Sequence, residues 1–140
     1  MKAYKIAARG KARHFTINGG LQEGYGPSGK LHTMEEVIQA HHDWQSERRQ
    51  PFGVLISQSD PSYGWPTGDG SIHSAIEPGW MVSGGINVFY DANLSDEEAL
   101  ERILDLAEFL GASLGQTRVY VSFMGEDVII QAPDKKTPRE

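Results

Sequence analysis

Three residues that can transfer protons recur every four positions in the segment 59–79: Asp69, His73 and Glu77. A histidine beside a carboxylate is a common arrangement for general acid and base catalysis, and the same side chains bind metal ions. Their spacing alone does not bring them together, because this segment has no sustained helical or strand periodicity. We therefore name His73, with Asp69 or Glu77, as the candidate catalytic pair of a small hydrolase or lyase.

Aromatic side chains occupy Tyr63 and Trp65 in the same segment and Trp80 directly after it. Aromatic rings beside polar groups can stack on a planar ligand such as a nucleobase. The alternative is that the tryptophans fold back and cover the sheet. Lys30 and Arg118 lie elsewhere in the chain and are candidate contacts for an anion. The predicted ligand-binding residues are Tyr63, Trp65, His73, Glu77, Trp80, Lys30 and Arg118.

The stretch GYGPSGKLHT (24–33) contains the G-x-G-x-x-G pattern of phosphate-binding loops. Such a loop places its glycines and lysine at the start of a helix, where backbone N–H groups meet the anion. Here Thr33 already caps the next helix, whose first turn carries two glutamates that repel a phosphate. Pro27 removes one N–H donor, and Leu31 stands where a hydroxyl would meet magnesium. We predict no nucleotide hydrolysis here and only a loose anion contact by Lys30.

The chain has no cysteine, which excludes disulfides, thiolate metal sites and a cysteine nucleophile. It also has no HxxxH or HExxH motif, and the adjacent residues His41, His42 and Asp43 point in different directions on a helix. We therefore predict no metal site and no cofactor.

The charge is unevenly distributed along the 140 residues, although the net value is −6. Residues 1–13 carry five basic side chains and no acid, which leaves eight basic and nineteen acidic residues in the remainder. This acidic body repels nucleic acid. No apolar run approaches the roughly 20 residues that span a membrane, and the N-terminus lacks the apolar core of a secretory signal. We predict a cytoplasmic protein that binds neither nucleic acid nor membranes.

The first half of the chain shows two strand patterns and one helix pattern. Alternating apolar residues predict a strand in HFTINGGL (14–21), and the near-continuous apolar run FGVLIS (52–57) is typical of a strand buried on both faces. Between them, TMEEVIQAHHDWQSERR (33–49) predicts an amphipathic helix that begins with a capping box formed by Thr33 and Glu36. The segment 59–79 follows as an irregular loop or a flexible hairpin.

The second half repeats the same alternation of strand and helix. WMVSGGINVFY (80–90) predicts a strand, and SDEEALERILDLAEFLG (95–111) predicts a helix capped by Ser95 and Glu98 that ends at Gly111 or Gly115. TRVYVSF and DVIIQ then form a strand pair or one bulged strand.

The order strand–helix–strand–strand–helix–strand predicts an α+β fold with a ferredoxin-like, split βαβ arrangement (βαββαβ). Its antiparallel sheet carries two helices on one face, with an extra C-terminal hairpin as an option. We expect a basic arm or edge strand at 1–13, one domain at 14–132 and a disordered tail at 133–140. Because INVFYD (86–91) and RVYVSF (118–123) are apolar on both faces, we also expect self-association through the uncovered face.

Two classes of function remain open from the sequence. The preferred hypothesis is a non-catalytic, self-associating protein that holds a small planar or anionic, nucleotide-like ligand between the segment 59–79 and the oligomer interface. The first alternative is the hydrolase or lyase that uses His73. The second is an interaction protein without a small-molecule ligand. We prefer the non-catalytic hypothesis because the spacing of residues along the sequence does not bring together a nucleophile, a base and a group that orients the base.

Overall fold

The computed structural model describes residues 3–24 and 28–133. In chain order its elements are β1 (His14–Gly20), α1 (Met34–Arg48), β2 (Leu55–Ser59), β3 (Ser62–Pro66), β4 (Ile72–Ile76), β5 (Gly79–Gly85), α2 (Asp96–Ser113), β6 (Arg118–Phe123) and β7 (Glu126–Gln131). The α+β class is thus confirmed, including the C-terminal hairpin of β6 and β7.

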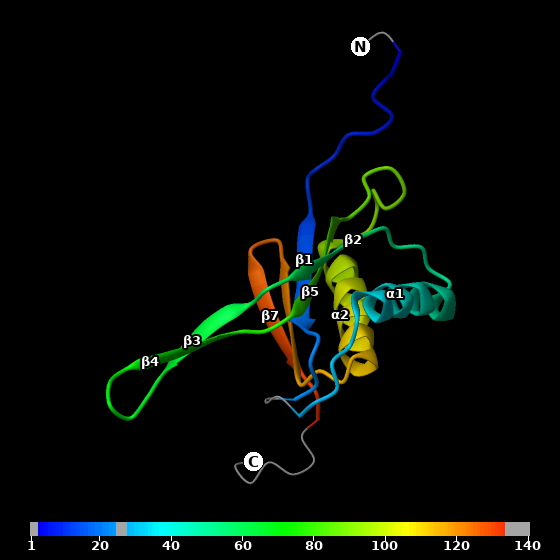
Figure 1. Ribbon diagram of the computed structural model, residues 1–140. Helices are drawn as coiled ribbons and strands as arrows, with labels where there is room; N and C mark the ends of the chain where they lie inside the picture. Colours follow the sequence, from blue (N-terminus) through cyan, green and yellow to red (C-terminus); the bar gives the residue numbers. More distant parts are fainter. Residues whose placement is uncertain (1–2, 25–27, 134–140) are drawn as a thin grey trace.

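Five strands form one antiparallel sheet in the order β2-β5-β1-β6-β7. Each helix connects two strands that have one other strand between them: β5 lies between β1 and β2, and β1 lies between β5 and β6. These are two split βαβ connections. Both helices cover the same face of the sheet (Figure 1).

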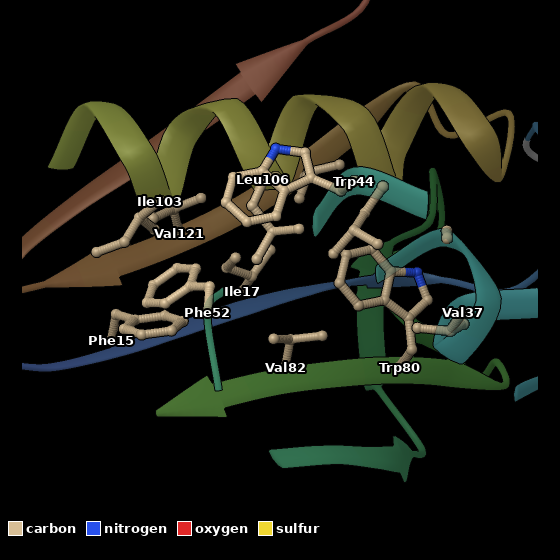
Figure 2. Close-up of a cluster of buried hydrophobic side chains, with 14 of the residues drawn as sticks. Phe15, Ile17, Val37, Trp44, Phe52, Trp80, Val82, Ile103, Leu106 and Val121 are labelled. Carbon is tan, nitrogen blue, oxygen red and sulfur yellow. The ribbon is translucent and has the colours of Figure 1, made fainter. Parts of the chain in front are cut away.

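The hydrophobic core lies between that face and the helices. In β1, Phe15 and Ile17 point toward the helices and are buried, whereas Thr16 and Asn18, which alternate with them, lie on the other face and are only half-buried. Figure 2 shows side chains of both helices and of β1, β5 and β6 packed together in this layer. One face of the sheet therefore has no helical cover.

Both capping boxes form as the sequence predicts. Thr33 and Ser95 accept hydrogen bonds from the backbone of Glu36 and Glu98, whose side chains return to the caps. The second helix continues through Gly111 to Ser113 and is capped by Leu114.

The segment 59–79 is an ordered hairpin that prolongs β2 and β5 away from the body of the protein (Figure 1). Its strands β3 and β4 pair antiparallel, with Tyr63 opposite Ala75 and Trp65 opposite His73. At its base, the N–H of Glu77 donates to the carbonyl of Pro61 at 3.0 Å. Of the two alternatives for this segment, an irregular loop and a flexible hairpin, the structure has the hairpin, and its strand pairing fixes the face of each side chain.

Two predicted strands are placed differently in the structure. FGVLIS was expected to be buried on both faces, but β2 starts at Leu55, lies at the sheet edge and is largely exposed.

WMVSGGINVFY was expected to be one strand through Tyr90, but β5 ends at Gly85. The side chain of Asn87 accepts hydrogen bonds from the N–H groups of Phe89 and Tyr90 and turns the chain. INVFYD therefore offers no two-sided strand, and that part of the argument for self-association was wrong.

Residues 3–13 contain no strand and lead into the start of β1. Arg13 donates to the carbonyl oxygens of Leu94 and Asp91 and forms an ion pair with Asp96. The predicted C-terminal tail lies almost entirely outside the described residues, so the proposed domain division stays a prediction. Among the described residues, neither helix is long and apolar enough to cross a membrane.

Candidate functional site

A groove of about 410 Å³ opens where the end of β1, the base of the β3–β4 hairpin and the start of β6 meet. This volume lies within the usual range for small-molecule sites. The described residues that line it include two charged side chains, Glu77 and Arg118, and two tyrosines. The full lining is Asn18, Gly19, Gly20, Gln22, Gly24, Pro61, Tyr63, Glu77, Gln116, Thr117, Arg118 and Tyr120.

The hairpin contributes an oriented carboxylate to the groove. The hydroxyl of Tyr63 donates to Oε1 of Glu77 at 2.6 Å, and both side chains line the groove. The hydrogen bond fixes the carboxylate while leaving its second oxygen available to a ligand, because a carboxylate offers several acceptor positions. The structure thus brings together two residues that the sequence placed fourteen positions apart.

The opposite wall is made of backbone from Gly19 and Gly20. Gln116 holds it in place: its Oε1 accepts from the N–H of Gly20 at 3.1 Å, and its Nε2 donates to the carbonyl of Gln22 at 3.2 Å. A Cβ on Gly19 would lie 2.8 Å from the ring of Trp80. Only glycine therefore allows the strand to pass over this ring.

Trp80 supports the groove from within the core and does not reach its surface. The side chain is fully buried, and its indole N–H donates to the carbonyl of Gly20 at 2.9 Å. The prediction that Trp80 contacts a ligand is therefore replaced by the alternative considered with it, in which the tryptophan covers the sheet.

Arg118 supplies the positive charge of the groove from the first position of β6. Its Nε donates to Oε1 of Gln131 on β7 at 3.0 Å, so the guanidinium is held by a neutral partner and keeps its full charge for a ligand. Tyr120, two residues further along the same strand, presents its ring on the same face and is 43% exposed.

An aromatic row continues from Tyr63 along the hairpin. The ring centroids of Tyr63 and Trp65 are 5.9 Å apart, and those of Trp65 and His73 are 5.8 Å apart. Trp65 and His73 lie beyond the groove lining, with Trp65 45% exposed. The row therefore extends a stacking surface outward from the groove.

Asp69 belongs to the turn of the hairpin. Its side chain accepts hydrogen bonds from the hydroxyl of Thr67 and from the N–H of Ser71, the latter at 2.9 Å. The bond from Thr67, followed by those from Ser71, lowers the pKa of Asp69 to about 2. The carboxylate of Asp69 thus stabilises the turn of the hairpin through these hydrogen bonds.

The proposed pairing of His73 with Asp69 or Glu77 does not form. Among the described residues, no hydrogen bond joins His73 to either carboxylate, and His73 faces Trp65 instead. Four residues along a strand span about 13 Å, which separates side chains that a helix would bring together. Of these three residues, Glu77 is the one that lines the groove.

Lys30 lies apart from the groove on an exposed stretch of loop. The carbonyl of Lys30 accepts from the N–H of Glu23, which closes a short loop before α1. Part of the glycine pattern, residues 25–27, lies outside the described residues. The start of α1 is occupied by its own capping box, as the sequence predicts.

The sequence reasoning missed several groove residues, among them Asn18, Gln22 and Gln116. The pair Gly19-Gly20 at the end of a strand was the available signal, because adjacent glycines mark a close approach of backbone. The sequence analysis also did not identify His32, which is buried between two carboxylates.

No known family model matches the sequence, and no curated protein matches it either. Solved structures do match the fold. A phage SAM (S-adenosylmethionine) lyase in complex with S-methyl-5′-thioadenosine superposes with a TM-score of 0.68 at 16% identity, covering 89% of this chain and 93% of the other. A phage SAM lyase in the apo state gives a TM-score of 0.66 at 16% identity, covering 97% and 99%. At this identity the likeness concerns the fold.

These comparisons overturn the preference for a non-catalytic protein. Both structures are enzymes of the lyase class, and one holds a small adenosine-like molecule. The sequence analysis placed catalysis second, as the alternative of a small hydrolase or lyase, because no catalytic group could be assembled from spacing alone. Tyr63 and Glu77 come within hydrogen-bond distance only through the register of the hairpin, which the spacing in the sequence does not reveal.

Proposed function

We propose that this protein is a lyase that binds S-adenosylmethionine in the groove and releases S-methyl-5′-thioadenosine. The observation that carries the proposal is the charge pattern of the groove: its charged lining residues are one carboxylate and one guanidinium, flanked by tyrosine rings. The likeness in fold to phage SAM lyases supports it.

The substrate's chemistry complements this pattern. S-adenosylmethionine carries positive charge on sulfur and on its amino group, negative charge on its carboxylate, and a planar adenine. Glu77 attracts the positive groups, Arg118 binds the carboxylate, and Tyr63 with Tyr120 supplies faces on which adenine stacks.

The proposed reaction breaks the bond between sulfur and the γ-carbon of the methionine moiety. Sulfur keeps the electron pair and becomes the neutral thioether of S-methyl-5′-thioadenosine. A proton leaves the β-carbon of the four-carbon amino acid fragment, and the electron pair of that C–H bond forms a double bond between its β- and γ-carbons, so that no water is added. Glu77 is the carboxylate of the described groove lining, and we assign it as the acceptor of this proton.

The direct test is to incubate the purified protein with S-adenosylmethionine and to follow S-methyl-5′-thioadenosine by chromatography and mass spectrometry. We expect stoichiometric release of the thioether, with no incorporation of ¹⁸O from labelled water into the four-carbon amino acid fragment. If the protein neither forms nor binds the thioether, the proposed function is overturned and an interaction protein without a small-molecule ligand remains.

Tyr63→Ala is expected to weaken binding of S-methyl-5′-thioadenosine roughly tenfold, because stacking of one base on an aromatic ring contributes about 1–3 kcal/mol. Tyr63→Phe keeps the ring and loses the hydrogen bond to Glu77. The phenylalanine variant should therefore bind the thioether almost normally and turn over substrate more slowly. Calorimetric titration and initial rates measure the two effects. Equal loss of affinity in both variants would contradict the stacking role.

The hairpin, rather than the glycine-rich segment, is predicted to supply most of the ligand contact. Trp65→Ala removes the second ring of the aromatic row and should weaken binding by up to about tenfold. Lys30→Ala should remove only a small, salt-dependent increment. Calorimetry at two ionic strengths ranks the two variants, with circular dichroism to confirm that each is folded. The reverse ranking would restore the phosphate-loop interpretation.

The protein is also proposed to self-associate. Tyr120 and Ile129 are 43% and 60% exposed on the sheet face without helices, and all residues of β3 are exposed. A two-stranded hairpin is marginally stable in water on its own. A second copy that covers this face would bury both surfaces and enclose the groove. Cytoplasmic location, and the absence of nucleic-acid and membrane partners, remain predictions from the charge and hydropathy of the sequence.

A further inference from the structure

His32 is a buried histidine held between two carboxylates. Its side chain is 5% exposed, its Nε2 lies 2.5 Å from Oε2 of Glu23, and its Nδ1 lies 2.5 Å from Oε2 of Glu36. Glu23 comes from the loop after β1, and Glu36 comes from the first turn of α1. The ring therefore ties a loop to the start of a helix.

Both ring nitrogens of His32 face carboxylate oxygens, and this arrangement favours the protonated ring. A neutral imidazole has one N–H donor and would direct a lone pair at one carboxylate, whereas an imidazolium donates to both. Burial lowers the pKa of His32, but the hydrogen bonds to Glu36 and Glu23 outweigh it and raise the pKa above its ordinary value of 6.5. The hydrogen bond from His32 in turn lowers the pKa of Glu36.

The loop held by His32 forms one wall of the groove. Gln22 and Gly24 both line the groove, and Glu23 lies between them in the chain. The backbone N–H of His32 also donates to the carbonyl of Leu21 at 2.8 Å. Glu23 is therefore the covalent link between two residues that line the groove.

The other side of Glu23 is closed by the turn between α2 and β6. A Cβ on Gly115 would lie 2.5 Å from the carboxyl carbon of Glu23, and Gly115 has a φ of 60°. The glutamate is thus packed between His32 and a turn that also carries the groove residue Gln116. Gly115 and Gln116 bring no charge to this contact.

We propose that protonated His32 is a positioning residue that holds the Gln22–Gly24 wall of the groove, so that ligand affinity falls when His32 loses its proton. The part of this inference that concerns the ligand rests on the proposed function. His32 does not line the groove, and it acts on the ligand through Glu23.

The direction of the pH dependence follows from the groups that face the ring. Glu23 and Glu36 contact it, and Lys30 acts on Glu36 from the loop. A histidine whose pKa is raised on folding contributes fully below 6.5, and its contribution is lost as pH rises through the folded-state pKa. Glu36 has a lowered pKa, so its carboxylate stays ionised and keeps its hydrogen bond with His32 unless the pH falls below 4.5, the ordinary pKa of a glutamate. Affinity should therefore be high below pH 6.5 and decline as pH rises through the raised pKa of His32.

The experiment is a calorimetric titration of the full-length protein with S-methyl-5′-thioadenosine from about pH 6 to about pH 10, combined with NMR titration of the histidine rings. This probe has no amine or carboxylate that titrates in the range. His32→Gln removes the titration, and Glu23→Gln weakens the clamp through a half-exposed side chain. His42→Gln on the exposed face of α1 is the matched control.

Unaltered protein and His42→Gln should lose affinity about tenfold across the range, with a midpoint equal to the NMR pKa of His32. His32→Gln should bind about tenfold more weakly at pH 6 and change little with pH. Glu23→Gln should shift the midpoint down. A His32 pKa that is not raised above 6.5, or a pH profile in His32→Gln that equals that of the unaltered protein, overturns the proposal.

Amide exchange of Gln22 and Glu23 separates this inference from the proposed function. If the loop amides exchange faster in His32→Gln but not in His42→Gln, the clamp holds the loop whatever the ligand is. If unaltered protein binds no thioether at any pH, the proposed function and the predicted pH dependence of affinity both fail. Unchanged exchange in His32→Gln overturns the clamp itself.

Discussion

Glu77→Gln is expected to reduce turnover of S-adenosylmethionine by about a thousandfold, because general bases contribute roughly 10²–10⁴ to rates. The amide keeps the size of the side chain and still accepts a hydrogen bond from Tyr63, but it carries no charge and cannot take a proton. Binding of the neutral product S-methyl-5′-thioadenosine should change little. Glu77→Gln should therefore show much slower turnover of S-adenosylmethionine together with an almost unchanged affinity for the product.

Single-turnover measurements with excess protein give the chemical rate, and calorimetry gives the product affinity. Glu126→Gln is the matched control, because Glu126 is an exposed glutamate at the start of β7 and lies outside the groove. Glu77→Gln with a rate within a few fold of the unaltered protein would contradict the assignment. If His73→Ala stopped turnover while Glu77→Gln did not, the proton acceptor would lie on the outer hairpin.

Tyr120→Glu is expected to dissociate the proposed oligomer at micromolar concentration. The tyrosine lies on the sheet face without helices, and a carboxylate buried there without a partner costs several kcal/mol. Sedimentation velocity should show an assembly for the unaltered protein and a species of 15.5 kDa for the variant. Because Tyr120 also lines the groove, ligand affinity should fall with it.

Tyr90→Glu is the control for this substitution. Tyr90 is 81% exposed in the turn after β5 and lies outside the groove lining and the sheet. The control should sediment like the unaltered protein. A monomer at all concentrations for unaltered protein would remove the proposal of self-association, and an oligomer that survives Tyr120→Glu would place the interface on another surface.

Local signals in the sequence determined most of the secondary structure. The capping boxes at Thr33 and Ser95 begin both helices, and alternation in HFTINGG identifies β1. These signals are reliable because the residues that interact lie within four positions of one another. The same local information identified the hairpin residues Tyr63 and Glu77 as candidates.

Strand order and tertiary packing decided which of the candidate residues come into contact. Sequence could not place FGVLIS at an edge, because exposure of a strand depends on the strands that flank it. The end of β5 at Gly85 has a local cause that the sequence analysis missed, since the side chain of Asn87 bonds the N–H groups of Phe89 and Tyr90. Trp80 is buried because Gly19, on the neighbouring strand, leaves room for its ring. Such contacts join residues about sixty positions apart, and no local pattern encodes them.

The groove illustrates this division most clearly. The sequence by itself determined that the segment 59–79 carries side chains for stacking, hydrogen bonding and proton transfer. Only the tertiary structure decided that Glu77 enters a groove while Asp69 stays in a turn, since strand register sets the face and position of each side chain. It also decided that Gln116 and Arg118 line the groove from the turn before β6 and from β6 itself, because the sheet order places β6 beside β1.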